Sequence, residues 1–477
     1  MIRFTRTRVA LLIASLSLAP AIADAATDVP ALPNQFAGAA ADDPTTALDA
    51  EWWAAYGSPE LSALLASAER ENLDVRAAAA RLQAAGARAR AAHASTRPTV
   101  DAGLGATHYA GHSNAGTAQE TDAGALLSAS YEIDFWGKHR ATIDSAVALE
   151  AVSRAERDTV VLATKAALAA GYFNVLSTRE RLHLAESDLA STQKILSLIE
   201  ARHAAHAVSD NELASQRGAV AAASLMVIDL TEQDAVARES LAVLAGRDPS
   251  GFLVAATDLS GIRMPSVGPG LPATLLQRRP DIEAAERALA AAHADVAVAR
   301  AALFPSVTLT AAGGVQNPAV QAAVATLTGT GATLTLGAQL VQSVFDGGRR
   351  RAVRAEAEAR ETELLLNYRS TIRNALVDVE TALSVRQALR TAAPAQDDAL
   401  AQSQRALDVA EARYRAGVGD YLNVLDAERA VTAAQQQMAQ YRLARLLNTL
   451  SLAKALGGGW HHTDSTPVAE LTSGTRP

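Results

Sequence analysis

The segment LSASYEIDFWGK, residues 127–138, decides the architecture because one structural element ends in it and another begins. Apolar residues alternate in it with small polar or acidic ones: Leu127, Ala129, Tyr131, Ile133 and Phe135 against Ser128, Ser130, Glu132 and Asp134. This period of two predicts a β-strand with one apolar and one polar face. The alternation stops at Gly137, and a helical pattern follows it.

Two β-hairpins are predicted, at about 99–135 and 306–345, because three further stretches alternate in the same way: 99–106, 307–311 and 334–340. Strands of about ten residues with this pattern are typical of outer-membrane barrels, whose strands cross the bilayer in about 9–11 residues. The acidic Asp101, Glu132 and Asp134 share the polar face and favour a water-filled lumen. A soluble hairpin with one buried face is the alternative that this pattern leaves open.

A very long helix is predicted after each hairpin. Residues 138–202 contain no proline, and apolar residues recur every seventh position from Val161 to Leu196. Small residues occupy most positions three further on, which allows close packing of helices as in a coiled coil. The second long helix, 349–415, keeps this pattern less regularly, and Pro394 predicts a kink in it.

The two halves of the chain are copies of one unit. Residues 72–75 match 279–282, and Gly137-Lys138 matches Gly348-Arg349 at nearly the same offset. Each unit is predicted to hold a helix, a hairpin, a long helix, a tip and a return helix. The predicted bounds are 60–246 for repeat 1, with long helix 138–202, tip 203–210 and return helix 211–245, and 279–457 for repeat 2, with long helix 349–415, tip 416–420 and return helix 421–456.

Four segments lie outside the repeats: a signal peptide at 1–25, an extended N-terminal segment at 26–59, a linker at 247–278 and a C-terminal tail at 458–477. The signal is indicated by three arginines, a short apolar core and the small-x-small sequence Ala23-Asp24-Ala25. Its apolar core is too short to span a bilayer. We therefore expect an exported chain with a cleaved signal peptide and no transmembrane helix.

The composition excludes several classes of protein. Aromatic residues are only 4 %, and the net charge is −8 with no basic stripe, which argues against nucleic-acid binding. The sequence has no cysteine, which excludes disulfides, thiolate metal sites and a lipidated N-terminal cysteine. No metal-binding, phosphate-loop or nucleophile-elbow motif is found, so neither an enzyme nor a cofactor is expected. His203 and His206 share a helical face, but the sequence gives them no further ligand nearby.

Four strands cannot close a membrane barrel, because open strand edges are not tolerated in lipid. Several copies must therefore combine their strands. Two copies give eight strands, and a barrel of that size is filled by its own side chains. A conduit needs at least three copies.

The residues also carry a family resemblance. The chain resembles the TolC-like outer-membrane factors of tripartite efflux systems, in the branch usually partnered with proton-driven inner-membrane pumps. The matching segments are EWW (51–53), SPEL (58–61), YEIDFWGK (131–138), LPATLLQRRPDI (271–282), AALFPSVTL (301–309), FDGGRRR (345–351), RYRAGVGDYL (413–422) and ALGGGW (455–460).

The resemblance implies an α+β membrane protein that works as a homotrimer. Each chain would give four strands to a twelve-stranded outer-membrane β-barrel, continuous with a long α-helical barrel in the periplasm. The implied partners are outer-membrane lipid, a periplasmic adaptor protein and a proton-driven inner-membrane pump. Many relatives carry a lipidated cysteine, so the resemblance predicts an anchor that this sequence does not supply.

The resemblance also implies an iris-like periplasmic gate at the two tips. By motif position Asp420 is expected to form a ring of three carboxylates, with Asp210 in the first tip. Arg413 and Tyr414, with Arg202 as the counterpart of Arg413, are expected to hold the closed state. The alternative is that these are ordinary turn and helix-cap residues.

The turns themselves are expected to contact the adaptor, through Val208 and Ser209 in the first tip and Gly417, Val418 and Gly419 in the second. Both glycines are expected to take the positive φ of a tight reversal. The counterpart of Gly417 in the first tip is His206, which departs from the family pattern.

These features predict a passive outer-membrane channel that conducts drugs or other small molecules from the periplasm to the exterior. A free-standing porin, a type I secretion duct and a soluble periplasmic coiled-coil protein are the alternatives. The sequence does not identify the transported substrate, because the expected lumen residues are small and generic.

Overall fold

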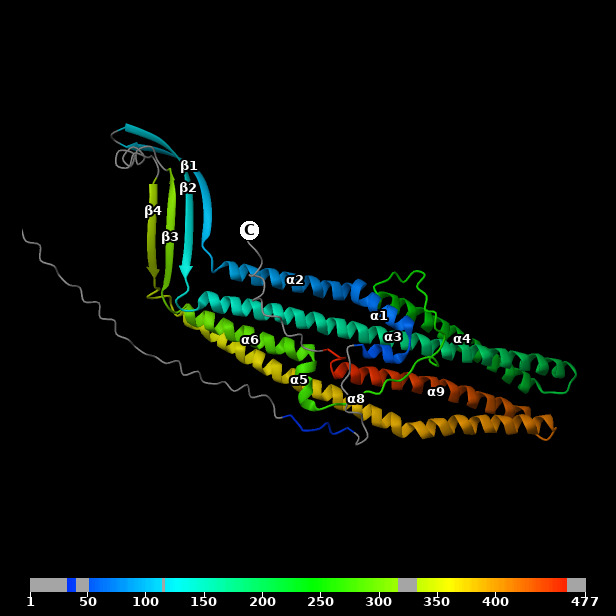
Figure 1. The fold of residues 1–477 in the computed structure, drawn as a ribbon. Coiled ribbons are helices and arrows are strands. Elements are labelled where there is room, and N and C mark those ends of the chain that lie inside the picture. Colours follow the sequence, from blue (N-terminus) through cyan, green and yellow to red (C-terminus); the bar gives the residue numbers. More distant parts are fainter. Residues whose placement is uncertain (1–31, 40–50, 114–115, 316–332, 461–477) are drawn as a thin grey trace, which may run out of the picture. The chain divides into compact units, whose positions relative to one another are not determined.

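The computed structural model describes residues 32–39, 51–113, 116–315 and 333–460, and every statement below concerns these ranges (Figure 1). The predicted signal peptide lies outside the described residues, as do the loop of the second predicted hairpin at 316–332 and the tail from 461. Residues from Pro33 onward form one unit by their contacts.

The chain alternates between helices and strands in the order that its repeat predicts. The helices are η1 (Trp52–Tyr56), α1 (Pro59–Glu71), α2 (Leu73–Ala94), α3 (Lys138–Ala204), α4 (Asp210–Leu244), η2 (Pro272–Thr274), α5 (Leu275–Arg278), α6 (Pro280–Ala301), α8 (Arg349–Arg415) and α9 (Tyr421–Ala455). The strands are β1 (Thr99–Ser113), β2 (Gly116–Ile133), β3 (Ser306–Val315) and β4 (Thr333–Val341).

The strands form one antiparallel sheet in the order β1-β2-β3-β4, so the hairpins of the two repeats pair through β2 and β3. The register sets Val100 opposite Ala129, which lies opposite Ala311, which lies opposite Leu336. Because paired residues share a face of the sheet, the alternating apolar residues predicted in all four strands fall on one face, while Leu126 and Val341 lie on the other. Most of the predicted apolar face is uncovered within the chain: Leu104 is 90 % exposed and Leu336 75 % exposed.

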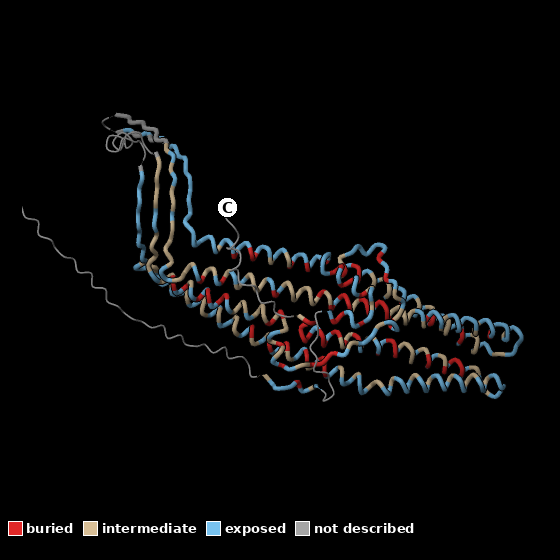
Figure 2. Tube along the Cα trace, in the orientation of Figure 1, coloured by how far each residue is buried: buried red, intermediate tan, exposed pale blue. Residues whose placement is uncertain are grey.

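Helix α3 is the centre of the helical part, since it packs against α2, α4, α6 and α9 (Figure 1). Figure 2 shows the buried residues gathered along the middle of the helices, with the tips and strands more exposed. In the predicted heptad of α3, Leu168 and Val175 are fully buried. Nearer the tip, the buried residues are the small ones three positions beyond the apolar heptad positions. Ala185 and Thr192 are buried there, whereas the apolar Leu189 is half-buried. Small residues therefore let α3 and α4 approach closely there.

Helix α8 runs from Arg349 to Arg415 with Pro394 inside it. The helix is not interrupted at the proline, and Figure 1 shows a bend in the half of α8 nearer α9. A bend is the expected response to a proline that removes one backbone hydrogen bond from the ladder.

By length and hydropathy alone, α3 and α4 each contain a window that could cross a membrane, which the sequence prediction of no transmembrane helix did not anticipate. A helix buried in the core of a protein can have the same length and hydropathy, so the window alone does not identify a membrane span. In α3, 44 % of the window is buried by the rest of the chain.

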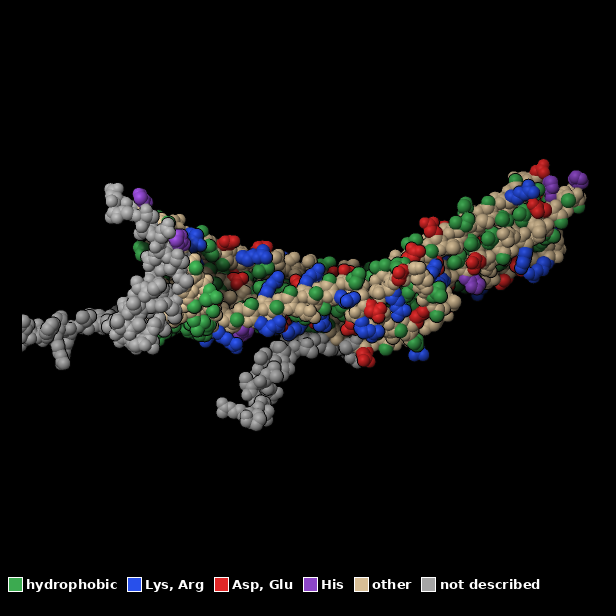
Figure 3. Space-filling model, turned by 90° about the horizontal axis from the view of Figure 1, so that it is seen from above, with side chains coloured by type: hydrophobic (Ala, Val, Ile, Leu, Met, Phe, Trp, Pro, Cys, Tyr) green, Lys and Arg blue, Asp and Glu red, His purple; other side chains and the backbone are tan. Residues whose placement is uncertain are grey.

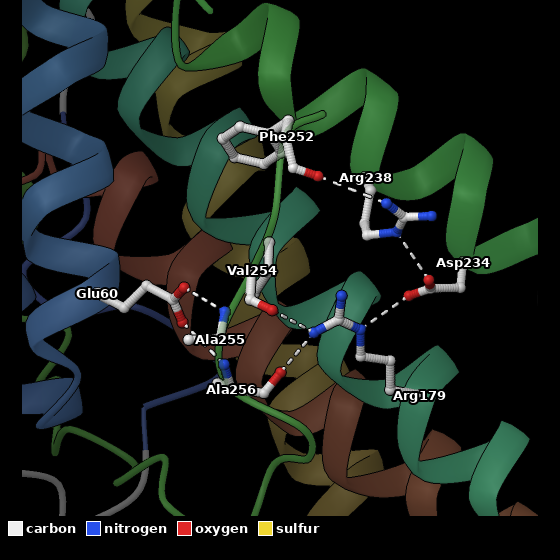
Figure 4. Close-up of polar contacts among 8 residues, drawn as sticks. All are labelled: Glu60, Arg179, Asp234, Arg238, Phe252, Val254, Ala255 and Ala256. Atoms are coloured by element: carbon white, nitrogen blue, oxygen red, sulfur yellow. Dashed lines mark hydrogen bonds and ion pairs between the residues drawn. The ribbon is translucent and has the colours of Figure 1, made fainter. Parts of the chain in front are cut away.

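The predicted linker between the repeats is held in place by charged side chains (Figure 4). The Glu60 carboxylate accepts hydrogen bonds from the N–H groups of Ala255 and Ala256, at 2.6 and 3.1 Å. From the other side, Arg179 Nη1 donates to the carbonyls of Val254 and Ala256, both at 2.7 Å. These bonds satisfy an extended stretch of backbone that has no strand partner.

Arg179 is fixed in turn by an ion pair. Its Nε lies 3.0 Å from Asp234, whose second oxygen lies 2.8 Å from Arg238 (Figure 4). All three side chains are less than a third exposed, so solvent screens them less than an ion pair on the surface. The arrangement joins α3, α4 and the linker at one point.

Replacing Arg179 by methionine should destabilise the protein by about 2 kcal/mol, because hydrogen bonds to charged groups contribute about 1.5–3 kcal/mol and the Val254 and Ala256 carbonyls lose their donor. The thermal unfolding midpoint in detergent would fall. The control is Arg217→Met, which breaks the exposed ion pair with Glu200, worth about 1 kcal/mol or less. Equal midpoints for the two variants would contradict this account.

Candidate functional site

The two tips end their long helices with the same backbone motif. At the end of α3 the N–H of Ala207 donates to Arg202 O and the N–H of His206 donates to His203 O, both at 2.8 Å. At the end of α8 the N–H of Val418 donates to Arg413 O at 3.1 Å, and Gly417 to Tyr414 O at 2.9 Å. Both pairs are the two bonds of a Schellman C-cap.

The left-handed residue of this motif differs between the tips. Gly417 has φ +75°, as predicted, and His206 takes the same role with φ +57°. His206 is the single non-glycine residue with positive φ among the described residues. A side chain costs about 1–2 kcal/mol in this conformation, so the first tip is under backbone strain that the second avoids.

The prediction for Gly419 was wrong, because Gly419 does not take a positive φ. It is required for a different reason: a Cβ there would lie 3.0 Å from the Cβ of Arg413 and 3.1 Å from the backbone N of Tyr414. The turn therefore packs directly onto the last turn of α8.

The return helices are capped by side chains at matching positions. Ser209 caps α4 and forms a capping box with Glu212, and Asp420 caps α9 by accepting a hydrogen bond from Leu422 N–H at 3.1 Å. By cap position the counterpart of Asp420 is therefore Ser209, whereas Asp210 is the first residue of α4.

Asp210 instead pairs with a histidine. Its Oδ1 lies 2.7 Å from His203 Nε2, and its side chain is 97 % exposed. No acidic partner was expected for His203 from the sequence, and this contact shows that the expectation was wrong. The described residues hold no cluster of three or more histidines and carboxylates with metal-site geometry.

One hydrogen bond joins the two tips. Arg202 Nη1 donates to the Tyr414 hydroxyl at 2.8 Å, and the Tyr414 ring packs against that of Tyr421 with centroids 5.2 Å apart. The structure thus brings together two of the predicted gate residues. Arg413 is exposed and makes no ion pair in the described part of the chain, whereas Arg415 pairs with Glu411. Figure 3 shows acidic, basic and histidine side chains gathered at this end of the helices.

An acidic cluster beside the tips was missed by the sequence analysis. Burial raises the pKa of Glu428, and the charges of Asp188 and Glu411 raise it further. The neighbouring Tyr421 hydroxyl is buried and has no hydrogen-bond partner among the described residues, and burial and the Glu428 charge raise its pKa. Asp188 and Glu428 come from different repeats, and no sequence pattern connects them.

The three predicted lumen residues have different surroundings. Asp101 is exposed on the polar face of β1, opposite Ser128. Glu132 is on the same face, 3.0 Å from Lys138 Nζ. Asp134 lies beyond the end of β2 and accepts a hydrogen bond from Arg140 N–H at 2.9 Å, so it helps to cap α3.

Replacing Glu428 by glutamine should raise the thermal unfolding midpoint at pH 7.5. A carboxyl whose folded pKa is raised stabilises the fold below its unfolded pKa, near 4.3, and loses that contribution as pH rises through the folded pKa. At pH 7.5 the wild-type protein holds the unfavourable charge and the variant does not. The difference between the two midpoints should shrink as pH falls toward 4.5.

The matched control is the exposed Glu232→Gln on α4. A thermal unfolding midpoint for Glu428→Gln at or below that of the control at pH 7.5 would show that the charge of Glu428 does not destabilise the fold.

Comparison with known proteins agrees with this architecture. The family model for outer membrane efflux proteins matches residues 64–247 and 271–458. The chain is 40 % identical over 419 residues to the pyoverdine export outer membrane protein OpmQ of Pseudomonas aeruginosa, covering 86 % of this chain and 87 % of OpmQ. It is 32 % identical to the toluene efflux pump outer membrane protein TtgF of Pseudomonas putida, covering 89 % of each.

A solved structure gives the same result at the level of the fold. The open state of the Neisseria gonorrhoeae MtrE outer membrane channel superposes with a TM-score of 0.81 at 27 % identity, covering 90 % of this chain and 96 % of MtrE. The chain therefore belongs to the outer membrane efflux protein family, the TolC-like channels of tripartite efflux systems.

Proposed function

We propose that three copies of this chain form a passive duct from the periplasm to the exterior. The observation that carries the proposal is the four-stranded sheet, with β1 and β4 at its edges and an apolar face left uncovered. Membrane strands need every edge paired. Three such sheets would supply twelve strands, more than the eight whose interior side chains fill.

The helices support the same assembly. Helix α4 exposes Leu225, Ile228 and Val236 at 67 %, 64 % and 55 %. Large apolar side chains gathered on one element are typical of a protein–protein contact. We propose that this side of α4 packs on a neighbouring copy, which would extend the helices into a closed α-helical barrel in the periplasm.

The gate is proposed to be the Arg202–Tyr414 hydrogen bond between the tips. In the trimer Asp420 would form a ring of three carboxylates at the narrowest point, with Asp210 near it. Val418 is 70 % exposed, and we propose that it contacts a periplasmic adaptor protein together with Gly417, Gly419, Val208 and Ser209. Arg413 would then be an adaptor or lumen contact, since its guanidinium is exposed.

Energy would come from an inner-membrane pump, proton-driven as the resemblance implies, because nothing in a passive duct supplies it. Export with cleavage after Ala25 would deliver the chain to the outer membrane.

For the cargo we propose small organic molecules, since the 40 % identical OpmQ exports pyoverdine. A panel of toxic compounds on a deletion strain tests the cargo. Sensitivity to metal ions alone would contradict it.

Replacing Tyr414 by phenylalanine removes one hydroxyl and with it the hydrogen bond from Arg202. Such a bond contributes about 0.5–1.5 kcal/mol, so the open-to-closed ratio should rise by about 2- to 10-fold per copy. Single-channel recording in planar bilayers measures it. The control is Tyr441→Phe, whose hydroxyl donates to Leu389 O at 2.8 Å away from the tips. Equal open times for the two variants would contradict the proposal that the Arg202–Tyr414 hydrogen bond holds the gate closed.

Replacing Asp420 by asparagine should reduce the cation preference of the channel while keeping the helix cap, since both residues cap helices well. The reversal potential in a salt gradient measures it. Asp426→Asn, which changes an exposed carboxylate on the same helix, is the control. If Asp420→Asn leaves the reversal potential unchanged, the ring is not part of the gate.

Partner capture separates the duct from a free-standing porin. A photo-cross-linker at Val418 should capture a periplasmic adaptor in cells. Capture at an exposed position far from the tips, such as Arg88, is not expected. No adaptor captured from Val418 would favour the porin.

A further inference from the structure

The chain passes between helices and sheet four times, and a cation lies at each crossing. Arg97 lies between α2 and β1, Arg140 follows β2, Arg300 precedes β3 and Arg349 follows β4. We call the four crossings together, residues 95–98, 134–140, 300–306 and 342–351, the collar. Figure 3 shows Lys and Arg side chains at the end of the helices next to the strands.

Exposed aromatic rings lie at three of the four crossings. Phe135, Trp136, Phe304 and Phe345 are 64 %, 50 %, 49 % and 89 % exposed. Trp136 stacks on Phe304 with centroids 4.6 Å apart, and its Nε1–H donates to Pro305 O at 2.7 Å. Phe135 continues the alternation of β2 on its apolar side. Such rings are typical of the boundary between lipid and water.

The acidic side chains in and next to the collar already have partners. Glu132, at the end of β2 beside the collar, pairs with Lys138 at 3.0 Å, and Asp134 accepts a hydrogen bond from the backbone N–H of Arg140. Asp346 accepts hydrogen bonds from the N–H groups of Gly348 and Arg350, at 3.0 and 3.2 Å. These carboxylates are held by backbone N–H groups, by Lys138 and, for Asp346, by the Arg350 guanidinium at 3.8 Å. The backbone N–H of Arg350 lowers the pKa of Asp346, and the charges of Arg350 and Arg349 lower it further, so Asp346 offsets part of the charge of one exposed arginine.

Four arginines of the collar are exposed and make no ion pair within the described residues. Arg97 precedes β1, and Arg140, Arg349 and Arg351 follow the second strand of a hairpin. Arg350 differs, because its Nη1 donates to Ala302 O at 2.8 Å. A protein with net charge −8 thus gathers four exposed arginines in one narrow zone.

A cavity of about 250 Å³ opens in the same zone. It lies between the end of β2, the start of α3, the end of α6 and the start of α8. Its walls include the stacked Trp136 and Phe304, the cations Lys138, Arg349 and Arg350, and the carboxylates Glu132 and Asp134. Glu132 is paired with Lys138, so the cavity offers an aromatic wall and, in Arg349, a cation without an ion pair that can bind a phosphate group.

We propose that the collar binds the phosphate groups of anionic phospholipids in the periplasmic leaflet of the outer membrane. This rests on the proposed function, because it takes the sheet to cross that membrane. Arginine binds phosphate oxygens through two parallel N–H groups, and each cation near an anionic surface contributes about a fivefold gain in affinity. The rings fit a lipid surface better than a soluble acidic protein, since Phe135 and Phe345 would enter the acyl boundary.

The test uses the intact protein in detergent and native mass spectrometry, with phosphatidylglycerol and phosphatidylcholine as probes. The wild type should bind phosphatidylglycerol more tightly by at least about tenfold, given about fivefold for each of three arginines with partial screening. The variant Arg140→Gln/Arg349→Gln/Arg351→Gln should lose this preference and keep its affinity for phosphatidylcholine. Added salt should weaken the preference in the wild type.

The control removes as many charges elsewhere, as Arg88→Gln/Arg373→Gln/Arg405→Gln, all exposed and outside the collar. Its lipid preference should equal that of the wild type. Equal affinities of the wild type for the two lipids, or a preference retained by the collar variant, would overturn the proposal.

Channel recording separates this proposal from the proposed function. A wild-type protein that conducts in phosphatidylcholine bilayers but shows no lipid preference would refute the collar alone. A protein that inserts into no bilayer of either lipid would refute the duct itself and the collar with it.

Discussion

Strands β1 and β4 each carry a row of backbone N–H and C=O groups that no other described strand of the same chain pairs. In water those groups bind solvent, but in lipid each unpaired group costs several kcal/mol. The exposed apolar face of the sheet is stable in lipid, but the unpaired backbone groups of its edges are not. In the proposed duct, lipid would cover the face and further copies would pair both edges, and the helices that follow each hairpin would then form a ring as well.

Duplication explains why the backbone repeats while the chemistry does not. The two tips share the Schellman motif, the cap position and the length of the return helix. They differ in the side chains placed on that backbone: His206 against Gly417, and Ser209 against Asp420. The hydrogen bond from Arg202 to Tyr414 therefore joins unlike residues of the two repeats.

Local rules predicted much of the fold. The alternation at 127–138 and the run of helical residues after it come from periods of two and seven, which depend only on neighbours in the sequence. The positive φ of Gly417 follows from the same local logic. What could not be predicted depends on residues that are distant in the sequence. Gly419 is required because of its close approach to Arg413. The pKa of Glu428 is raised first by burial and then by the charge of Asp188 from the other repeat.

The central claim is that β1 of one copy pairs with β4 of the next, and cysteine cross-linking tests it most directly, because the chain has no cysteine of its own. Within one chain, β1 and β4 are three strand spacings apart, about 14 Å, beyond the roughly 7 Å limit for a disulfide. Ala102→Cys would be combined in turn with Leu336→Cys, Ala338→Cys and Leu340→Cys. The account predicts covalent multimers up to the trimer for at least one pair under oxidising conditions, and monomers alone for every pair would contradict it.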